Sequence, residues 1–186
     1  MASNGDALRL DELVPAGGSW SGLLFDNPHL GLEAGLTWTF EVGFRDVERE
    51  YGSTPVGLTA NWVPLPGASW MTMTGQDASC ERFGEPIECS AYFFEHYRYD
   101  RTRVTVLEQD DQRIRVRVQA AGDIDGLGIA SWSIEEWLMF GGITVELTGV
   151  ERVDDASAQL RRRSDISGLN GSPTQQGFRF RPAALD

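Results

Sequence analysis

Hydrophobic and polar residues alternate along most of the chain, and this period of two predicts β-strands. The clearest case is residues 37–46, where every second position from Trp38 to Phe44 is large and apolar. A strand of this kind buries one face and exposes the other to solvent. Similar patterns predict further strands over residues 56–63, 70–74, 87–100, 104–106 and 114–118.

The register of one hairpin follows from its side chains. Val104 and Val106 must share a buried face with Val116 and Val118, because arginines occupy the alternate positions of the second strand. Pairing Val106 with Val116 and Val104 with Val118 requires a loop with an odd number of residues around Asp110-Asp111.

Three segments are less regular. Both faces of the 87–100 segment become charged at its end, so we expect a bulge, corner or turn at residues 98–103. Residues 129–150 fit a short helix, but a hairpin that turns at Gly141-Gly142 is favoured. Residues 155–164 fit either a final strand or a short helix.

The predicted strands are joined by short connections without interleaved helices, which favours one all-β domain. We expect an antiparallel up-and-down β-barrel of about 8–10 strands, although a two-layer sandwich shows the same alternation. Residues 1–18 are expected to form an N-terminal arm with a short helix that starts at Asp6 and stops at Pro15. The barrel is expected over 19–166, and the Gly-, Ser- and Gln-rich segment 167–186 is expected to be a flexible arm.

The motif Gly18-Ser19-Trp20 stands at the start of the first predicted strand. It resembles the G-x-W signature of lipocalins and the wider family of calycin barrels. The resemblance implies a calycin-like barrel in which Trp20 closes one end and a late arginine packs over its ring, a contact that cation–π attraction favours. Arg152, Arg179 or Arg181 could be that arginine.

The charge of the chain argues against two classes of partner. Its 186 residues include 28 acidic and 16 basic side chains, for a net charge of -12. Such a charge repels the phosphates of nucleic acids and anionic membrane surfaces. The N-terminal segment does not resemble a secretory signal and no apolar run is long enough to span a bilayer, so we expect a cytoplasmic protein.

Two residue types limit the chemistry further. All basic residues are arginines, so lysine imine chemistry and a P-loop lysine are excluded. The two cysteines, Cys80 and Cys89, are expected to be buried thiols rather than a disulfide. With two histidines in the chain, a site of several histidines is excluded, and we expect no metal or other cofactor.

Large and adaptable side chains gather on the predicted strands. Trp and Met side chains of this kind suit a pocket for a flat or hydrophobic molecule. The candidate ligand-binding residues are Trp62, Trp70, Met71, Met73, Phe94, Trp132, Trp137 and Met139.

Candidate catalytic residues come from two strands. Glu136 is predicted to point to the same face as Leu138, where a carboxylate needs a partner or holds its proton. His96, Tyr97 and Tyr99 form a second cluster that could polarise a substrate.

These features lead to two functional hypotheses. In the first, the barrel encloses a small hydrophobic or aromatic molecule, either as a carrier or as a cofactor-free cyclase or isomerase of a bacterial natural-product pathway. In the second, the chain is an acidic immunity or interaction protein that binds a basic protein partner. A homodimer is compatible with either.

Overall fold

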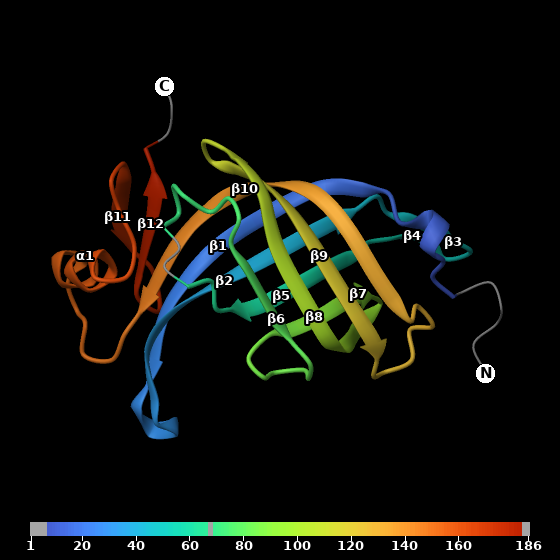
Figure 1. The fold of residues 1–186 in the computed structure, drawn as a ribbon, viewed down its shortest axis with the longest axis horizontal. Helices are drawn as coiled ribbons and strands as arrows, with labels where there is room; N and C mark the ends of the chain where they lie inside the picture. The colour runs from blue at the N-terminus through green and yellow to red at the C-terminus, as the bar shows by residue number, and fades with distance from the viewer. Residues whose placement is uncertain (1–6, 67–68, 184–186) are drawn as a thin grey trace.

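The protein is an all-β barrel, as the alternation predicts. The computed structural model describes residues 7–66 and 69–183. Seven strands follow one another around the barrel, and hydrogen bonds between β1 and β10 close it (Figure 1). This closing pair is parallel, whereas the other pairs are antiparallel, so the barrel is mixed rather than fully antiparallel. The strands of the barrel are β1 (Pro15–Asn27), β2 (Leu32–Phe44), β5 (Gly57–Val63), β7 (Glu88–Phe93), β8 (Glu95–Asp110), β9 (Arg113–Asp123) and β10 (Ser131–Glu146).

Alternation predicted β2 and the β8–β9 register correctly. Every second residue of β2 from Trp38 to Phe44 is buried. Val104 lies opposite Val118 and Val106 opposite Val116. The predicted odd loop is wrong, because β8 and β9 are joined by the two residues Asp111-Gln112 and a bulge near Leu107 shifts the register instead.

Strand β10 contradicts both predictions for residues 129–150. It runs without a turn for 16 residues, through Gly141-Gly142, and contains no helix. The two glycines instead form a bulge, because β10 gains one residue between the Trp20–Phe140 and Gly22–Ile143 pairs with β1. Gly142 has a φ of 104°, a conformation that L side chains rarely adopt.

The turn after β7 lies earlier than the sequence predicted. Phe94, at a φ of 62°, is the single residue between β7 and β8, so the reversal precedes residues 98–103. Beyond β7, the edge of β8 pairs with a short strand, β6 (Asp77–Cys80). The strand predicted over 70–74 is also wrong, because that segment forms turns.

Both ends of the chain contain more regular structure than expected. The predicted N-terminal helix reduces to the 3₁₀ turn η1 (Leu10–Glu12), and Pro15 begins β1 rather than ending a helix; Asp6 lies outside the described residues. After β10 comes helix α1 (Val153–Arg161), the helical alternative for residues 155–164. The segment expected to be a flexible arm contains β11 (Leu169–Pro173) and β12 (Phe178–Pro182), and β12 pairs with β10. The remaining elements are η2 (Pro28–Leu30), β3 (Val47–Arg49) and β4 (Gly52–Thr54).

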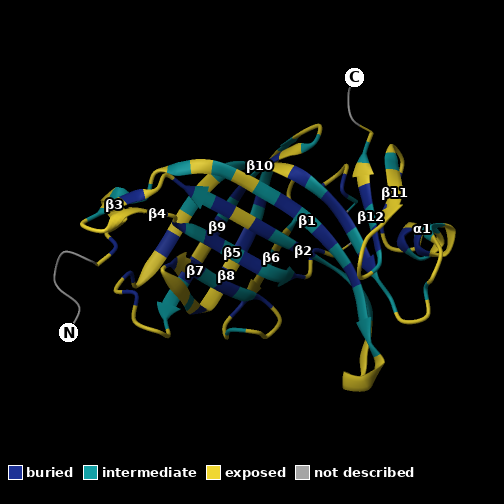
Figure 2. Ribbon diagram, turned by 180° about the vertical axis from the view of Figure 1, so that it is seen from behind, coloured by how far each residue is buried: buried dark blue, intermediate teal, exposed yellow. Residues whose placement is uncertain are grey.

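Aromatic side chains fill the barrel interior. Buried and exposed positions alternate along its strands (Figure 2). The Trp20 cluster joins Trp20 to Trp38 and Phe140 at ring-centroid distances of 5.4 and 4.5 Å, and Trp70 stacks on Phe140 at 4.8 Å. Trp132 contacts Phe44 and Tyr99 in a second group, the Trp132 cluster.

Candidate functional site

The eight candidate ligand-binding residues do not gather around one pocket. Trp70, Met73 and Trp132 are buried in the core, and the first and last of these belong to the two aromatic clusters. Met71, Phe94 and Met139 are instead 48–59% exposed. These two sets therefore lie in different environments, one packed and one in solvent.

The other two candidate tryptophans, Trp62 and Trp137, are half-buried, and their rings contact neighbouring side chains. Trp62 has a φ of 59°, which breaks the alternation of β5, so Val63 rather than Trp62 takes the next buried position. The Trp62 ring packs against Phe25 at 5.9 Å. Trp137 lies beneath the guanidinium of Arg113, 5.4 Å from the ring centroid.

The candidate catalytic tyrosines have different surroundings. Tyr99 is fully buried, its hydroxyl donates to the carbonyl of Ile129 at 3.0 Å, and burial raises its pKa to about 12. Tyr97 is half-buried, and burial and its 3.1 Å hydrogen bond to Glu95 raise its pKa. Neither group is a stronger acid than an ordinary tyrosine.

The other two candidate catalytic residues lie on different strands, His96 on β8 and Glu136 on β10. His96 is exposed, and its ring lies edge-on to Tyr92. Glu136 on β10 is half-buried on the same side of the strand as Leu138, and its carboxylate accepts a 2.7 Å hydrogen bond from the backbone N–H of Trp137. The structure gives no contact between Glu136 and the His96–Tyr99 segment among the described residues.

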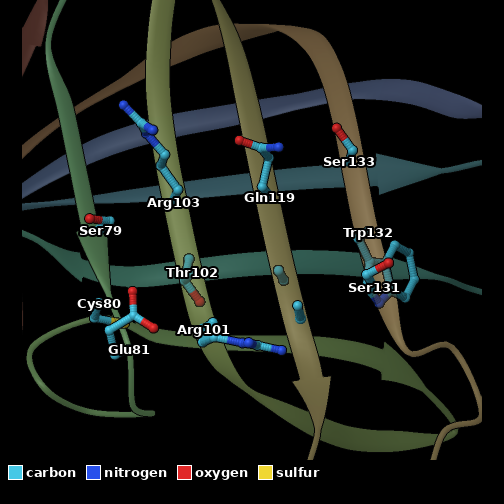
Figure 3. A pocket seen from close by; sticks show the side chains of 12 residues that line it. Ser79, Cys80, Glu81, Arg101, Thr102, Arg103, Gln119, Ser131, Trp132 and Ser133 are labelled. Carbon is cyan, nitrogen blue, oxygen red and sulfur yellow. The ribbon is translucent and has the colours of Figure 1, made fainter.

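A hollow of about 440 Å³ lies elsewhere, over the outward-facing positions of β6, β8, β9 and β10 (Figure 3). Strand pairing builds it from two rows of side chains. One row runs Ser79, Arg103, Gln119, Ser133, each residue opposite the next on the neighbouring strand. The other row runs Arg101, Ala121, Ser131. We call this set the outer hollow.

Small side chains create the depression. Ala121 and the serines leave space above the sheet, while the longer Arg101, Arg103 and Gln119 rise beside them. In Figure 3, the Arg101 side chain extends from β8 towards β9. The row between the two faces inward and contains Thr102, Ala120 and Trp132, all buried.

Most polar groups of the outer hollow have no partner within the described part of the chain. Arg103 donates to Asp77 at 3.0 Å, which anchors it at the β6 side. Arg101, Gln119 and the serine hydroxyls have no hydrogen bond or ion pair with any described side chain or backbone group. The hollow therefore offers one unpaired guanidinium, one amide and three hydroxyls to a ligand. The carboxylate of Glu81 also lines it and opposes the binding of an anion.

Sequence reasoning missed this site, although one signal was present. The register predicted for Val104 and Val118 already places Arg103 opposite Gln119 and Arg101 opposite Ala121. The contributions of β6 and β10 depend on strand pairings that the sequence pattern did not indicate.

The described residues lack two further features. Their His, Cys, Asp and Glu side chains nowhere form a group of three that could hold a metal ion. None of their helices has the length and apolar character needed to cross a membrane.

The features behind the calycin resemblance are present in part. Trp20 is fully buried, and its indole N–H donates to the carbonyl of Gln112 at 3.3 Å. Its ring contacts are Trp38 and Phe140; within the described residues no arginine stacks on it, and Arg179 binds the carbonyl of Gly141 instead. The barrel is thus compatible with a calycin-like fold without the expected arginine contact. No protein-family model matches the chain, and neither the curated proteins nor the solved structures provide a match.

Proposed function

We propose that this chain is a non-covalent binding protein whose outer hollow receives a small polar molecule that carries a carboxylate. The observation behind the proposal is the concentration of unpartnered polar side chains from four strands around one depression. Paired strands hold the backbone positions of these side chains fixed, which limits the entropy lost on binding to that of the side chains themselves.

The chemistry of the hollow suggests the ligand class. Hydroxyls and an amide both donate and accept hydrogen bonds, so they suit a molecule with several hydroxyl groups. A free guanidinium such as Arg101 favours a carboxylate, which it can bind through two parallel hydrogen bonds. A sugar acid or a hydroxy acid combines both features.

A hydrophobic ligand inside the barrel, as carrier cargo or cyclase substrate, is a weaker candidate. Such a molecule would have to displace the Trp20 cluster or the Trp132 cluster, whose members are at most 6% exposed. Displacing packed aromatic side chains costs about 3–5 kcal/mol for each one removed from the core. The outer hollow requires no such displacement.

The test is a titration of the protein with a panel of gluconate, glucuronate, citrate and glucose in turn. Isothermal calorimetry measures the affinity, and native mass spectrometry measures the number of molecules bound per chain. We expect saturable binding of an acidic member at one molecule per chain. Arg101→Gln should weaken it about tenfold, because a charge-assisted pair is lost. Ala121→Leu should weaken it by filling the hollow without a change in charge.

Arg45→Gln is the matched control, because Arg45 is exposed and has no side-chain partner in the described structure. It removes the same charge outside the hollow and should leave the affinity unchanged. If Arg45→Gln and Arg101→Gln weaken binding equally, the effect reflects the net charge of the protein and not a contact in the outer hollow, which contradicts the proposal. Absence of binding across the panel would overturn the proposal.

The net charge of -12 favours a second candidate, an acidic protein that binds a basic protein partner. Association of that kind slows steeply as salt rises, because exposed charges are screened beyond about 8 Å at physiological ionic strength. The affinity for a carboxylate in the outer hollow would also fall as salt rises, but Ala121→Leu should weaken only the small-molecule complex.

A further inference from the structure

A second polar hollow lies where β12 and the β11–β12 turn meet the end of β10. It has a volume of about 560 Å³, and Arg179 and Arg181 of β12 and Thr144 of β10 line it. Arg179 is opposite Thr144 in the strand register, and Arg181 follows on the same face of β12. In Figure 1, β12 lies beside the end of β10, next to β11 and α1. We call this place the β12 hollow.

Arg179 is exceptional among the arginines of this chain. Four arginines are half-buried rather than exposed: Arg49, Arg115, Arg117 and Arg179. The first three form ion pairs with Glu12, Glu108 or Glu135. Arg179 forms no ion pair within the described residues.

Neutral groups hold the Arg179 guanidinium in place. Its Nε and one terminal nitrogen donate to the carbonyl of Gly141 at 3.2 and 2.7 Å, and the other terminal nitrogen donates to the hydroxyl of Thr144. These bonds use three of its five N–H groups. Two donors therefore remain on a positive charge that forms no ion pair with a described carboxylate.

The environment adds to the electrostatic cost of this charge. Burial and the neighbouring Arg181 lower the pKa of Arg179, and Glu41 opposes them only in part. An arginine cannot avoid this electrostatic cost by losing its proton, because the pKa of a guanidinium lies far above neutrality. Half-buried positive charge without a counter-ion is normally compensated by a bound anion or an acidic partner.

One carboxylate lies at the same hollow. Glu146 lines it but forms no ion pair with either arginine among the described residues. Glu146 would repel a bound anion, whereas Arg181 would attract it, so the two side chains have opposite effects on the affinity for the same ligand. Gln175 and Thr174 supply neutral donors at the rim.

We propose that the β12 hollow is a binding site for a phosphate-like oxyanion, held between Arg179 and Arg181. Two adjacent guanidinium groups and a threonine hydroxyl match the several acceptor oxygens of a phosphate group. This site shares no residue with the outer hollow, so it stands independently of the function proposed above.

The experiment titrates the full-length protein with inorganic phosphate and pyrophosphate by isothermal calorimetry, with sodium chloride used to keep the ionic strength constant. We expect saturable binding at one ion per chain. Arg181→Gln should weaken it about tenfold, because one charge-assisted contact is lost. Arg181 is exposed, so the variant is expected to fold.

Two further variants test the assignment. Glu146→Gln should strengthen binding about threefold by removing a repulsive charge. Arg82→Gln removes an exposed arginine outside this hollow that has no side-chain partner in the described structure, and it should have no effect.

The proposal is overturned by either of two results. One is the absence of saturable phosphate or pyrophosphate binding to the wild-type protein. The other is an affinity that Arg181→Gln and Arg82→Gln change equally, because the effect would then report net charge rather than this site.

Discussion

The replacement of Trp20 by alanine tests whether the barrel interior is packed as the structure shows. Trp20 is fully buried and contacts Trp38 and Phe140. Removing a buried tryptophan costs about 3–5 kcal/mol of unfolding free energy, and each lost aromatic contact adds roughly 0.5–1.5 kcal/mol. The lost indole hydrogen bond adds little, since the carbonyl of Gln112 keeps a 2.8 Å bond from the backbone N–H of Phe140.

We therefore expect Trp20→Ala to lose about 4–8 kcal/mol of unfolding free energy, a large share of the 5–15 kcal/mol typical of a folded domain. Trp62→Ala is the matched control. Trp62 is half-buried and has one ring contact, so its loss should cost about 1–2 kcal/mol. Urea unfolding, monitored by far-UV circular dichroism, measures the stability of both variants. Tryptophan fluorescence is less suitable, because each substitution removes one of the fluorophores.

The binding of free indole tests directly whether Trp20→Ala leaves a cavity. A cavity that matches the deleted ring should bind indole and recover about 1.4 kcal/mol at a concentration ten times the dissociation constant. Wild type and Trp62→Ala should not respond. If Trp20→Ala does not fold, Trp20→Leu provides a milder version of the cavity. A loss within about 1 kcal/mol of that of Trp62→Ala would refute a tightly packed interior.

Three further predictions concern the backbone and buried titratable groups. A Cβ at Gly142 would lie 2.5 Å from the carbonyl oxygen of Phe180, so Gly142→Ala should cost about 1–3 kcal/mol and speed hydrogen exchange in β12; unchanged exchange would contradict it. Cys80 and Cys89 are buried and free, and burial raises the pKa of Cys89 to about 12, so neither should react quickly with a thiol reagent at pH 8 until the protein unfolds; rapid labelling of the native protein would contradict their burial. Tyr99 has its pKa raised from 10.0 to about 12, so its contribution to stability is complete below pH 10 and disappears as the pH rises through 12; Tyr99→Phe should lessen this alkaline loss in unfolding measurements, and equal losses in both proteins would contradict the assignment.

Sequence reasoning succeeded where one buried face controls the structure. In β2 the alternation continues without interruption, and in the β8–β9 hairpin the three arginines of β9 admit only one pairing with the valines of β8. A shift of one residue would turn every valine to solvent, so the register follows from local sequence. The exact turn did not follow, because a bulge near Leu107 and an odd loop satisfy the same pairing.

The errors lie where partners distant in sequence decide the outcome. Gly141-Gly142 has the composition of a tight turn, yet pairing with β1 keeps β10 continuous through it. Trp62 follows the apolar alternation of β5, but its left-handed backbone moves it out of the buried series. A bulge and a turn share the same preferred residues, and only the neighbouring strand distinguishes them.

The outer hollow was missed for a related reason. The site residues predicted from the sequence are large aromatic, acidic and histidine side chains, whereas the outer hollow is lined mainly by serines, a glutamine and arginines at outward positions. Such residues are ordinary on any exposed sheet face. Their significance comes from the register of four strands, which brings them together without a motif.

Both hollows lie beside the two longest strands of the barrel, β8 and β10. Consecutive antiparallel strands alternate in direction, so the first and seventh strands run the same way and the barrel closes through the parallel β1–β10 pair. Strands β8 and β10, of 16 residues each, extend beyond one neighbour each, β7 and β9. An uncovered edge invites aggregation, and β6 covers the excess of β8 while β12 covers that of β10. Each added strand carries polar side chains to the outer face, so each proposed binding site lies where an additional strand completes an edge of the barrel.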